Sequence, residues 1–564
     1  MGGVVQAGVR SPGLQPRTSR GQPVSTDRSS QEIRREIERR RTFAIISHPD
    51  AGKTTLTEKL LLYGGALREA GAVRAQKAAR HATSDWLELE KQRGISVSSS
   101  VLHFEFAGHR VNILDTPGHR DFSEDTYRTL MAADSAVMLI DAARGVEPQT
   151  RKLCEVCRLR QIPIFTFVNK MDRHGRDPLD IMAEIEDVLG MDVVPANWPV
   201  GSGSDFRGIY DRLMRRLVLF SGGDHGTHRV DEETLVGEPG GPASREAMGP
   251  FADEVCEGLE LLEGAGAELD AELVAKGSQT PMFFGSALTN FGVRPFLERY
   301  LEMAPGPVPR QSGGESIDPV ERPFSGFVFK IQANMDPDHR DRVAFIRICS
   351  GQFVKGRQTS HARTGKPIRL MNSTLLMGKD RAEVEEAFAG DVVGLFDPGI
   401  FRIGDTLADE SGVVYAGIPI FAPESYMRVE VAGVRKRKAL EKGIEQLVQE
   451  GVVQLFRDPE GGSASWILGA MGPLQFDVMK HRLKTEYGVE LILSNLPYTL
   501  ARWPQAGFDP EDFKYSERIR VVRDRDDRWA LLANSAWDFD RLCERNESLE
   551  LAETPDPSLF ESAS

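Results

Sequence analysis

The sequence has few cysteines and no long apolar run. Its five cysteines in 564 residues are too few, and odd in number, for a disulfide framework, which suits a reducing compartment. No stretch of about 18 apolar residues occurs, and this excludes a membrane-spanning helix. Residues 1–30 lack the apolar segment of a signal peptide, and Gln6 does not fit a myristoylation motif. Their Arg- and Ser-rich composition is compatible with a transit peptide but favours a disordered basic extension. We therefore expect a cytoplasmic protein with no membrane partner.

Metal-binding cysteine clusters and a strongly basic surface are also missing. Cys154 and Cys157 form a CxxC pair, but no second pair completes a tetrahedral metal site. We interpret the pair as part of one buried helix face. The net charge of −14 argues against non-specific nucleic-acid binding, so any contact with RNA must use local basic surface such as Arg435–Lys438.

The chain is long enough for several domains, and its patterning changes twice. From Thr42 to about Pro305, short apolar strands alternate with helical stretches. This alternation predicts an α/β domain with a doubly wound, mostly parallel sheet, whose ligands lie at the carboxyl ends of the strands. The strands are expected at 43–47, 111–114, 136–140, 162–168 and 282–284.

A Pro/Gly/Ser linker at 304–316 ends this pattern. Glycine-punctuated strands after it predict a β-barrel domain, and mixed helices and strands from about residue 418 predict a C-terminal α+β domain. We expect a monomer divided into a disordered N-terminal extension (1–37), the α/β domain (38–308, with an insertion around 201–277), the β-barrel domain (309–415), the α+β domain (416–551) and a disordered tail (552–564).

The first functional motif lies between the strand at 43–47 and a helix. It is a P-loop in which serine replaces the usual first glycine, and its residues are Ser47, His48, Pro49, Asp50, Ala51, Gly52, Lys53, Thr54 and the following Thr55. Successive backbone N–H groups of such a loop point at phosphates, helped by the dipole of the helix. Lys53 is expected to neutralise the β- and γ-phosphates, and the Thr54 hydroxyl to ligate Mg²⁺.

Two further motifs follow strands, and a third, weaker one completes the set. Asp115 of the first is expected to hold Mg²⁺ through water and Gly118 to meet the γ-phosphate; its residues are Asp115, Thr116, Pro117, Gly118 and His119. The Asp172 carboxylate of the second accepts two hydrogen bonds from guanine that adenine cannot supply; its residues are Asn169, Lys170, Met171 and Asp172. The weaker segment offers a backbone N–H to guanine O6 and contains Ser286, Ala287 and Leu288. Together these motifs predict binding of GTP and GDP.

His119 is the candidate that orients the attacking water, either as a base or as an imidazolium. The polar segment 84–97 suits a loop that orders around the γ-phosphate and Mg²⁺. Within it, Ser96 offers a second hydroxyl ligand for Mg²⁺, and Ile95 an apolar barrier near His119. Because no arginine or lysine is an obvious cis-acting finger, we expect slow intrinsic hydrolysis that needs an external partner to align His119.

These motifs resemble those of the translational GTPase family, and within it the bacterial release factor 3 branch. The resemblance rests on the P-loop, on SDWLELEKQRGISVSSSV, on DTPGHRDFSEDTYRTL and, past the linker, on GFVFKIQANMDPDHRDRVAFIRICSG, and it covers about Arg40 to Leu551. It implies a three-domain GTPase that acts on the ribosome during termination. Its implied partners are the ribosome and the codon-reading (class I) release factors, whose departure such proteins promote.

Other functions are weighed against this one. An elongation factor or ribosomal-protection GTPase would normally carry further C-terminal domains. A ribosome-binding or assembly factor that only binds nucleotide would not need a water-orienting group such as His119. An ATP-dependent P-loop enzyme is opposed by Asp172, which favours guanine.

Overall fold

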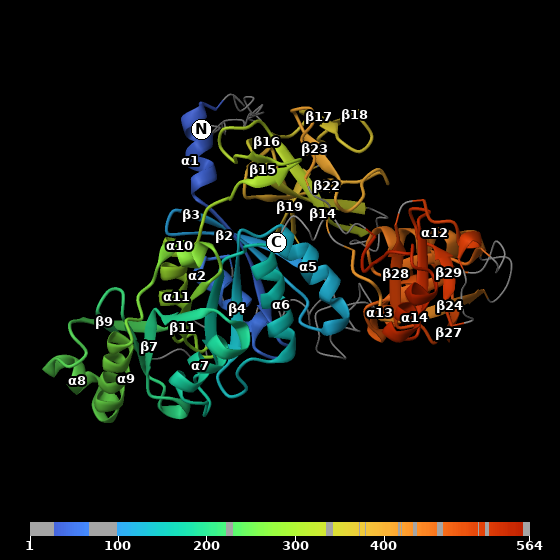
Figure 1. Ribbon diagram of the computed structural model, residues 1–564. Coiled ribbons are helices and arrows are strands. Elements are labelled where there is room, and N and C mark those ends of the chain that lie inside the picture. Colours follow the sequence, from blue (N-terminus) through green and yellow to red (C-terminus); the bar gives the residue numbers. More distant parts are fainter. Residues whose placement is uncertain are drawn as a thin grey trace, which may run out of the picture.

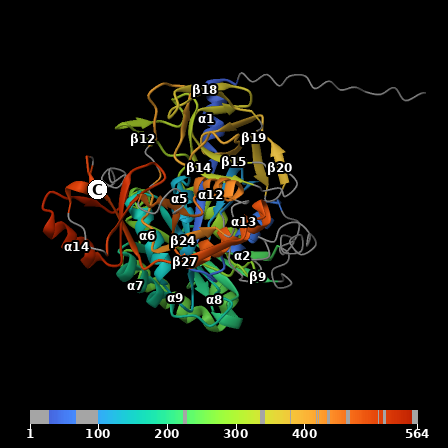
Figure 2. The ribbon, with the colours of Figure 1, turned by 90° about the vertical axis from the view of Figure 1, so that its right-hand side faces the viewer.

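The computed structural model describes residues 28–66, 99–221, 229–333, 342–371, 373–377, 380–415, 418, 420–431, 437–459, 466–505, 507–513 and 518–555. They form three domains, with the second and the C-terminal domain packed against different sides of the first (Figures 1 and 2). Within these residues, no helix has the length and apolar character needed to span a membrane.

The first domain is built on a seven-stranded sheet of order β2-β3-β1-β4-β5-β11-β6, which is parallel except for the β2–β3 pair. The strands are β1 (Arg40–Ser47), β2 (Ser100–Phe106), β3 (His109–Asp115), β4 (Ser135–Asp141), β5 (Ile164–Asn169), β6 (Asp192–Pro195) and β11 (Gln279–Phe284). The helices are α2 (Lys53–Tyr63), α5 (Ser123–Met131), α6 (Pro148–Leu159), α7 (Pro178–Leu189) and α11 (Val293–Met303), with the short η1 (Arg120–Phe122) before α5. This confirms the predicted α/β class.

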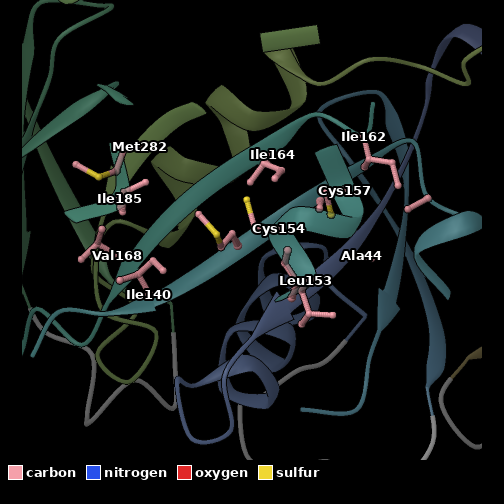
Figure 3. Close-up of a cluster of buried hydrophobic side chains, with 14 of the residues drawn as sticks. Ala44, Ile140, Leu153, Cys154, Cys157, Ile162, Ile164, Val168, Ile185 and Met282 are labelled. Carbon is pink, nitrogen blue, oxygen red and sulfur yellow. The ribbon is translucent and has the colours of Figure 1, made fainter. Parts of the chain in front are cut away.

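The central strands are apolar on both faces because helices cover both sides of the sheet. Every residue of β4, β5 and β11 is buried. Cys154 and Cys157 of α6 lie in the core on one side of the sheet, among residues such as Leu153 and Ile164 (Figure 3). Burial raises the pKa of Cys154 to about 11, so this thiol stays protonated. The pair packs as part of one buried helix face.

A second, antiparallel sheet begins just before the expected insertion at 201–277, and three of its four strands lie within it. Its strands run in the order β10-β9-β8-β7 and are β7 (Asn197–Val200), β8 (Gly208–Asp211), β9 (Arg216–Ser221) and β10 (Asp231–Val236). The accompanying helices are α8 (Pro242–Met248), α9 (Ala252–Gly264) and α10 (Ala271–Ala275), with η2 (Gly203–Asp205) and η4 (Gly249–Phe251). Figure 1 shows α8 and α9 at the end of the first domain that is remote from the other two domains.

The prediction of disorder throughout 1–37 is wrong for its last residues. Helix α1 spans Ser30–Glu38, and Ser29 begins it with a capping box in which the Ser29 and Glu32 side chains each accept from the other residue's backbone N–H. Ile37 is buried in the core of the second domain. A local cap and the packing of Ile33 and Ile37 therefore order a segment whose polar composition suggests disorder.

The second domain is a curled antiparallel sheet, in agreement with the β-barrel domain predicted after the linker. Its main sheet has the order β18-β17-β23-β14-β15-β22-β19-β20. The strands are β14 (Ser325–Ala333), β15 (Arg342–Ser350), β17 (Gln358–His361), β18 (Lys366–Arg369), β19 (Ser373–Met377), β20 (Asp380–Glu383), β22 (Val392–Phe396) and β23 (Thr406–Ala408). Two smaller pairs join β12 (Arg310–Ser312) to β13 (Glu315–Ile317) and β16 (Gln352–Val354) to β21 (Glu386–Phe388).

The C-terminal domain has an eight-stranded sheet of order β27-β24-β26-β25-β29-β30-β28-β31. Its strands are β24 (Ser425–Val431), β25 (Gln454–Arg457), β26 (Trp466–Ala470), β27 (Leu491–Asn495), β28 (Leu500–Pro504), β29 (Arg520–Arg523), β30 (Trp529–Ala533) and β31 (Leu551–Ala552). The helices are α12 (Arg437–Gln449), α13 (Pro473–Tyr487) and α14 (Ala536–Arg545), with η7 (Pro510–Asp512). Disorder was predicted from residue 552, but Ala552 pairs with Trp503; residues 556–564 lie outside the described part.

Buried ion pairs join the second domain to the first. The Arg347 guanidinium lies 2.6 Å from an Asp134 carboxylate oxygen, and both side chains are almost fully buried. The Arg40 Nε atom lies 2.7 Å from the Asp391 carboxylate, which is also buried. Because removing one member of a buried pair leaves an unpaired charge at a cost of about 3–5 kcal/mol, these contacts hold the two domains in a defined arrangement.

Candidate nucleotide-binding and catalytic site

The predicted motifs meet at the carboxyl edge of the parallel sheet. The P-loop follows β1, the turn with His119 follows β3, and the loop with Asp172 follows β5. The strand register accounts for their approach, because Ile45 of β1 pairs with Asp115 of β3, and Asp141 of β4 with Asn169 of β5. Parallel strands end at the same edge, so residues separated by more than a hundred positions form one site.

The P-loop owes its shape to two residues with a left-handed backbone. Asp50 has φ of 65° and Gly52 has φ of 103°, and the Ala51 N–H donates to the His48 carbonyl at 3.3 Å. Helix α2 begins directly after Gly52 and has no side-chain cap at its first turn. The first N–H groups of this helix are therefore suited to an anionic ligand. Thr54 and Thr55 are half-buried in the same first turn.

Gly52 is required both for its backbone and for its lack of a side chain. A Cβ atom at this position would overlap the Asn169 amide, which ties the P-loop to the loop after β5. We expect Gly52→Ala to reduce GDP affinity by about 10-fold or more, since the loop must move to relieve strain and overlap. Titration with a fluorescent GDP analogue measures this. Gly264→Ala is the matched control, because a Cβ there meets nothing within 4 Å; unchanged affinity for Gly52→Ala would contradict the assignment.

Lys53 is buried beneath the loop and contacts the motif after β3. Its ammonium donates to the Thr116 carbonyl, and the Thr116 hydroxyl donates to the Ile45 carbonyl at 2.7 Å. Burial lowers the pKa of Lys53, while the nearby Asp115 carboxylate acts in the opposite direction. A Cβ atom on Gly118 would lie 3.5 Å from the Lys53 ammonium, so the turn passes close to the P-loop. The charge of Lys53 is thus placed between the two motifs that are predicted to bind phosphate.

His119 lies at the start of η1, next to this turn. Its Nδ1 atom accepts a hydrogen bond from the Asp121 N–H at 3.2 Å. A nitrogen that accepts carries no proton, so the neutral ring in this geometry has its proton on Nε2. The side chain is 32% exposed, and its edge faces Phe122. The ring is therefore held at Nδ1, and no hydrogen bond to Nε2 is found among the described residues.

The residues predicted to bind the base form a connected set. Asn169 donates to the Ala51 carbonyl at 2.8 Å and accepts from the Ala287 N–H at 2.8 Å, so one side chain ties two loops together. Asp172 accepts from the Ser286 hydroxyl at 2.5 Å. The Met171 N–H donates to the Gly285 carbonyl at 3.2 Å. The loop after β11 thus fixes the carboxylate that is expected to read guanine.

Sequence reasoning overlooked one residue of this set. Asp141, at the end of β4, accepts a hydrogen bond from the Lys170 ammonium at 2.7 Å. Burial opposes ionisation of Asp141, but the bonds from Lys170 and from the Ala143 N–H outweigh it and lower the pKa of the carboxyl. Lys170 itself has a left-handed backbone with φ of 70°. A carboxylate at the end of a buried strand, like Asp115, was the signal that could have revealed it.

The remaining predicted residues occupy varied positions. The Pro117 carbonyl accepts from the Thr126 hydroxyl of α5 at 3.1 Å. His48 Nε2 lies 3.4 Å from the Glu147 carboxylate, and the Leu288 side chain is exposed. Ser96, Ile95 and the rest of segment 84–97 lie outside the described residues, so the predicted second Mg²⁺ ligand has no structural test.

Three family models match the chain in order. They are the elongation factor Tu GTP binding domain over residues 38–306, elongation factor G domain 2 over 323–410, and the class II release factor RF3 C-terminal domain over 415–542. The third match argues against an elongation factor.

Curated relatives match nearly the whole chain. Peptide chain release factor 3 of Symbiobacterium thermophilum is 56% identical over 91% of this chain and 97% of the relative. That of Gloeobacter violaceus is 51% identical over 93% of this chain and 99% of the relative. A crystal structure of a Thermus thermophilus protein superposes with a TM-score of 0.64 at 27% identity, covering 86% of this chain and 72% of that one. The chain therefore belongs to the peptide chain release factor 3 family and is a translational GTPase.

Proposed function

We propose that this protein hydrolyses GTP on the ribosome at termination and thereby promotes the departure of the codon-reading (class I) release factors. The C-terminal domain, matched by the release-factor model, supports this placement among translational GTPases. The protein would act as a monomer in the cytoplasm, where bacterial ribosomes complete their peptides. The observation that carries the proposal is that one chain combines this C-terminal domain with a sheet edge that holds the P-loop, the turn with His119 and the loop with Asp172.

The residues at the sheet edge suit a guanosine di- or triphosphate. The P-loop residues Ser47 to Thr55, including Lys53, would hold the phosphates, with Gly118 at the γ-phosphate. Asp172, with Asn169, Lys170 and the backbone of Ser286 to Leu288, would hold the guanine. Within the described part of the chain, the buried Ser47 hydroxyl has no hydrogen-bond partner, which fits a polar ligand beside it.

The same edge offers ligands that fit Mg²⁺. The Thr54 hydroxyl and the Asp115 carboxylate are hard oxygen donors, which Mg²⁺ prefers, and Ser96 is proposed as a further hydroxyl ligand. When bound, the ion neutralises charge on the β- and γ-phosphate oxygens. Lys53 adds a protein charge at the same place, and its burial strengthens that interaction by excluding water.

His119 is the proposed catalytic residue. With Nδ1 accepting from the Asp121 N–H, the neutral ring carries its proton on Nε2, which makes that nitrogen a donor. A donor orients water and stabilises developing charge, whereas a general base needs an unprotonated Nε2. The geometry thus favours the orienting role for His119. The ribosome would supply the final alignment of His119, which fits the slow GTP hydrolysis expected of the protein alone.

A recycling assay tests this function. We expect this protein with GTP to speed the loss of a labelled class I release factor from post-termination ribosomes by about 10-fold or more. The reason is that a factor gated by GTP shifts an equilibrium only when its GTP and GDP states differ strongly in affinity for their partner. The same protein with GDP alone is the control for turnover-dependent recycling. A release factor that leaves no faster with GTP would reject the termination role, although the GTPase assignment would survive.

A further inference from the structure

The C-terminal domain contacts the segment next to His119 through one buried carboxylate. Asp121 lies in η1, two residues after His119, and its Oδ2 atom accepts a hydrogen bond from the Leu474 N–H at 2.8 Å. Leu474 is in the first turn of α13, whose cap residue is Gly472. Because glycine has no side chain, this helix has no cap of its own, and a carboxylate from another domain caps it.

The same residue also holds His119. The Asp121 N–H donates to His119 Nδ1, and the Asp121 Oδ1 atom lies 3.4 Å from that nitrogen. One end of Asp121 therefore fixes the histidine ring, while the other end is fixed by the C-terminal domain. Asp121 is 7% exposed, so water competes little for either contact.

Further contacts around Asp121 join the same two domains. Phe122 packs against Val478, Val452 and Leu474 of the C-terminal domain. Arg128 of α5 donates to the Glu450 and Gly451 carbonyls at 3.2 and 3.0 Å. In Figure 1, α5 lies on the side of the first domain that faces the C-terminal domain.

We propose that Asp121 is a positioning residue through which α13 of the C-terminal domain holds His119 in place, so that seating of this domain sets the rate of GTP hydrolysis. The inference rests on the proposed role of His119. Among the contacts that the structure describes, Asp121 makes none with the nucleotide-binding residues Lys53 or Asp172. Loss of its carboxylate should therefore slow turnover and leave nucleotide affinity unchanged.

Gly472 allows a test from the opposite side of the interface. Its φ is −164°, an extended backbone that alanine adopts freely, but an added Cβ atom would overlap the Asp121 carboxylate. Gly472→Ala should thus displace the Asp121 side chain without changing any residue of the first domain. It also leaves the Leu474 N–H in place.

The experiment is a double-mutant cycle on ribosome-stimulated GTP turnover. We expect Asp121→Ala and Gly472→Ala each to lower kcat by about 10- to 100-fold, as loss of a hydrogen bond to a charged group implies, with GDP affinity within about 2-fold. The double variant should match Asp121→Ala alone, because the overlap no longer exists. Asp121→Asn, which keeps an oxygen acceptor for Leu474, should recover most of the rate.

Two controls separate positioning from general damage. Glu424→Gln removes an exposed ion pair with Arg120 across the same two domains and should leave kcat within about 2-fold, since exposed pairs contribute little. Gly264→Ala controls for the glycine substitution.

Several outcomes would overturn the inference. Wild-type turnover in both single variants, additive losses in the double variant, a loss in Glu424→Gln as large as in Asp121→Ala, or a parallel fall in GDP affinity would each do so. If His119→Ala turned over normally, or the wild type gained nothing from ribosomes, the proposed function would fail first and the inference with it. Stimulated wild-type turnover with an inactive His119→Ala and fully active Asp121→Ala would reject the inference alone.

Discussion

Replacing His119 with alanine is expected to abolish ribosome-stimulated GTP turnover while GTP still binds. A positioned proton donor or acceptor contributes about 10²–10⁴-fold to such reactions, so kcat should fall by that factor. Among the described residues, the ring contacts Asp121 and Phe122 but none of the residues proposed to bind guanine. GDP affinity should accordingly stay within about 2-fold of wild type, because ground-state binding uses other groups. Single-turnover hydrolysis with ribosomes, together with equilibrium titration of a fluorescent GDP analogue, measures both.

His109→Ala is the matched control for this variant. His109 begins β3, at the opposite end of the strand from Asp115, so its loss should leave turnover unchanged. Normal stimulated turnover in His119→Ala would remove His119 from the mechanism. If turnover and thermal stability fell together, the variant would be misfolded. The titration with GDP would reveal this as a loss of nucleotide affinity.

Asp172→Asn is expected to exchange guanine for xanthine selectivity. The carboxylate accepts two hydrogen bonds from guanine N1–H and the exocyclic amine, whereas an amide has one acceptor and adds a donor. A lost bond to a charged group costs about 1.5–3 kcal/mol, so GDP affinity should fall by about 10- to 100-fold and xanthosine diphosphate affinity should rise. The Ser286 hydroxyl, 2.5 Å from Asp172 Oδ1, can still donate to the amide oxygen, so the loop should keep its shape.

Competition of a fluorescent GDP analogue by GDP and by xanthosine diphosphate gives the selectivity directly. Asp187→Asn, on an exposed part of α7, makes the same chemical change away from the base and should behave as wild type. Retention of full guanine preference by Asp172→Asn would mean that another group reads the base.

The parts of the site that lie within one short stretch of sequence could be predicted. The P-loop needs a strand, a short loop with glycine at a left-handed position and a helix, and all three are visible within residues 43–63. The motifs after β3 and β5 likewise follow apolar strands that end abruptly in polar residues. Helix α1 was missed, although Ser29 and Glu32 form a capping box, because the composition of residues 1–37 outweighed a four-residue pattern.

Contacts between distant segments left no such signal. Asp121 and Leu474 are 353 residues apart. A single carboxylate that meets one backbone N–H of another domain has no periodicity, so no pattern within the chain announces it. The antiparallel sheet of β7 to β10 was missed for a related reason, since its short strands are interrupted by glycine and acidic residues.

By itself, the amino-acid sequence determined that this protein is a GTPase, and it predicted the groups of the site: a loop of backbone N–H groups with Lys53, a carboxylate proposed to bind guanine and a histidine after the third strand. These follow from residue types at strand ends, which parallel strands always bring to one edge. Only the tertiary structure decided how that edge is connected to the rest of the molecule. The Lys170–Asp141 bond, the buried Arg347–Asp134 pair and the capping of α13 by Asp121 depend on how separate elements pack, and packing brings together residues that the order of the chain keeps apart.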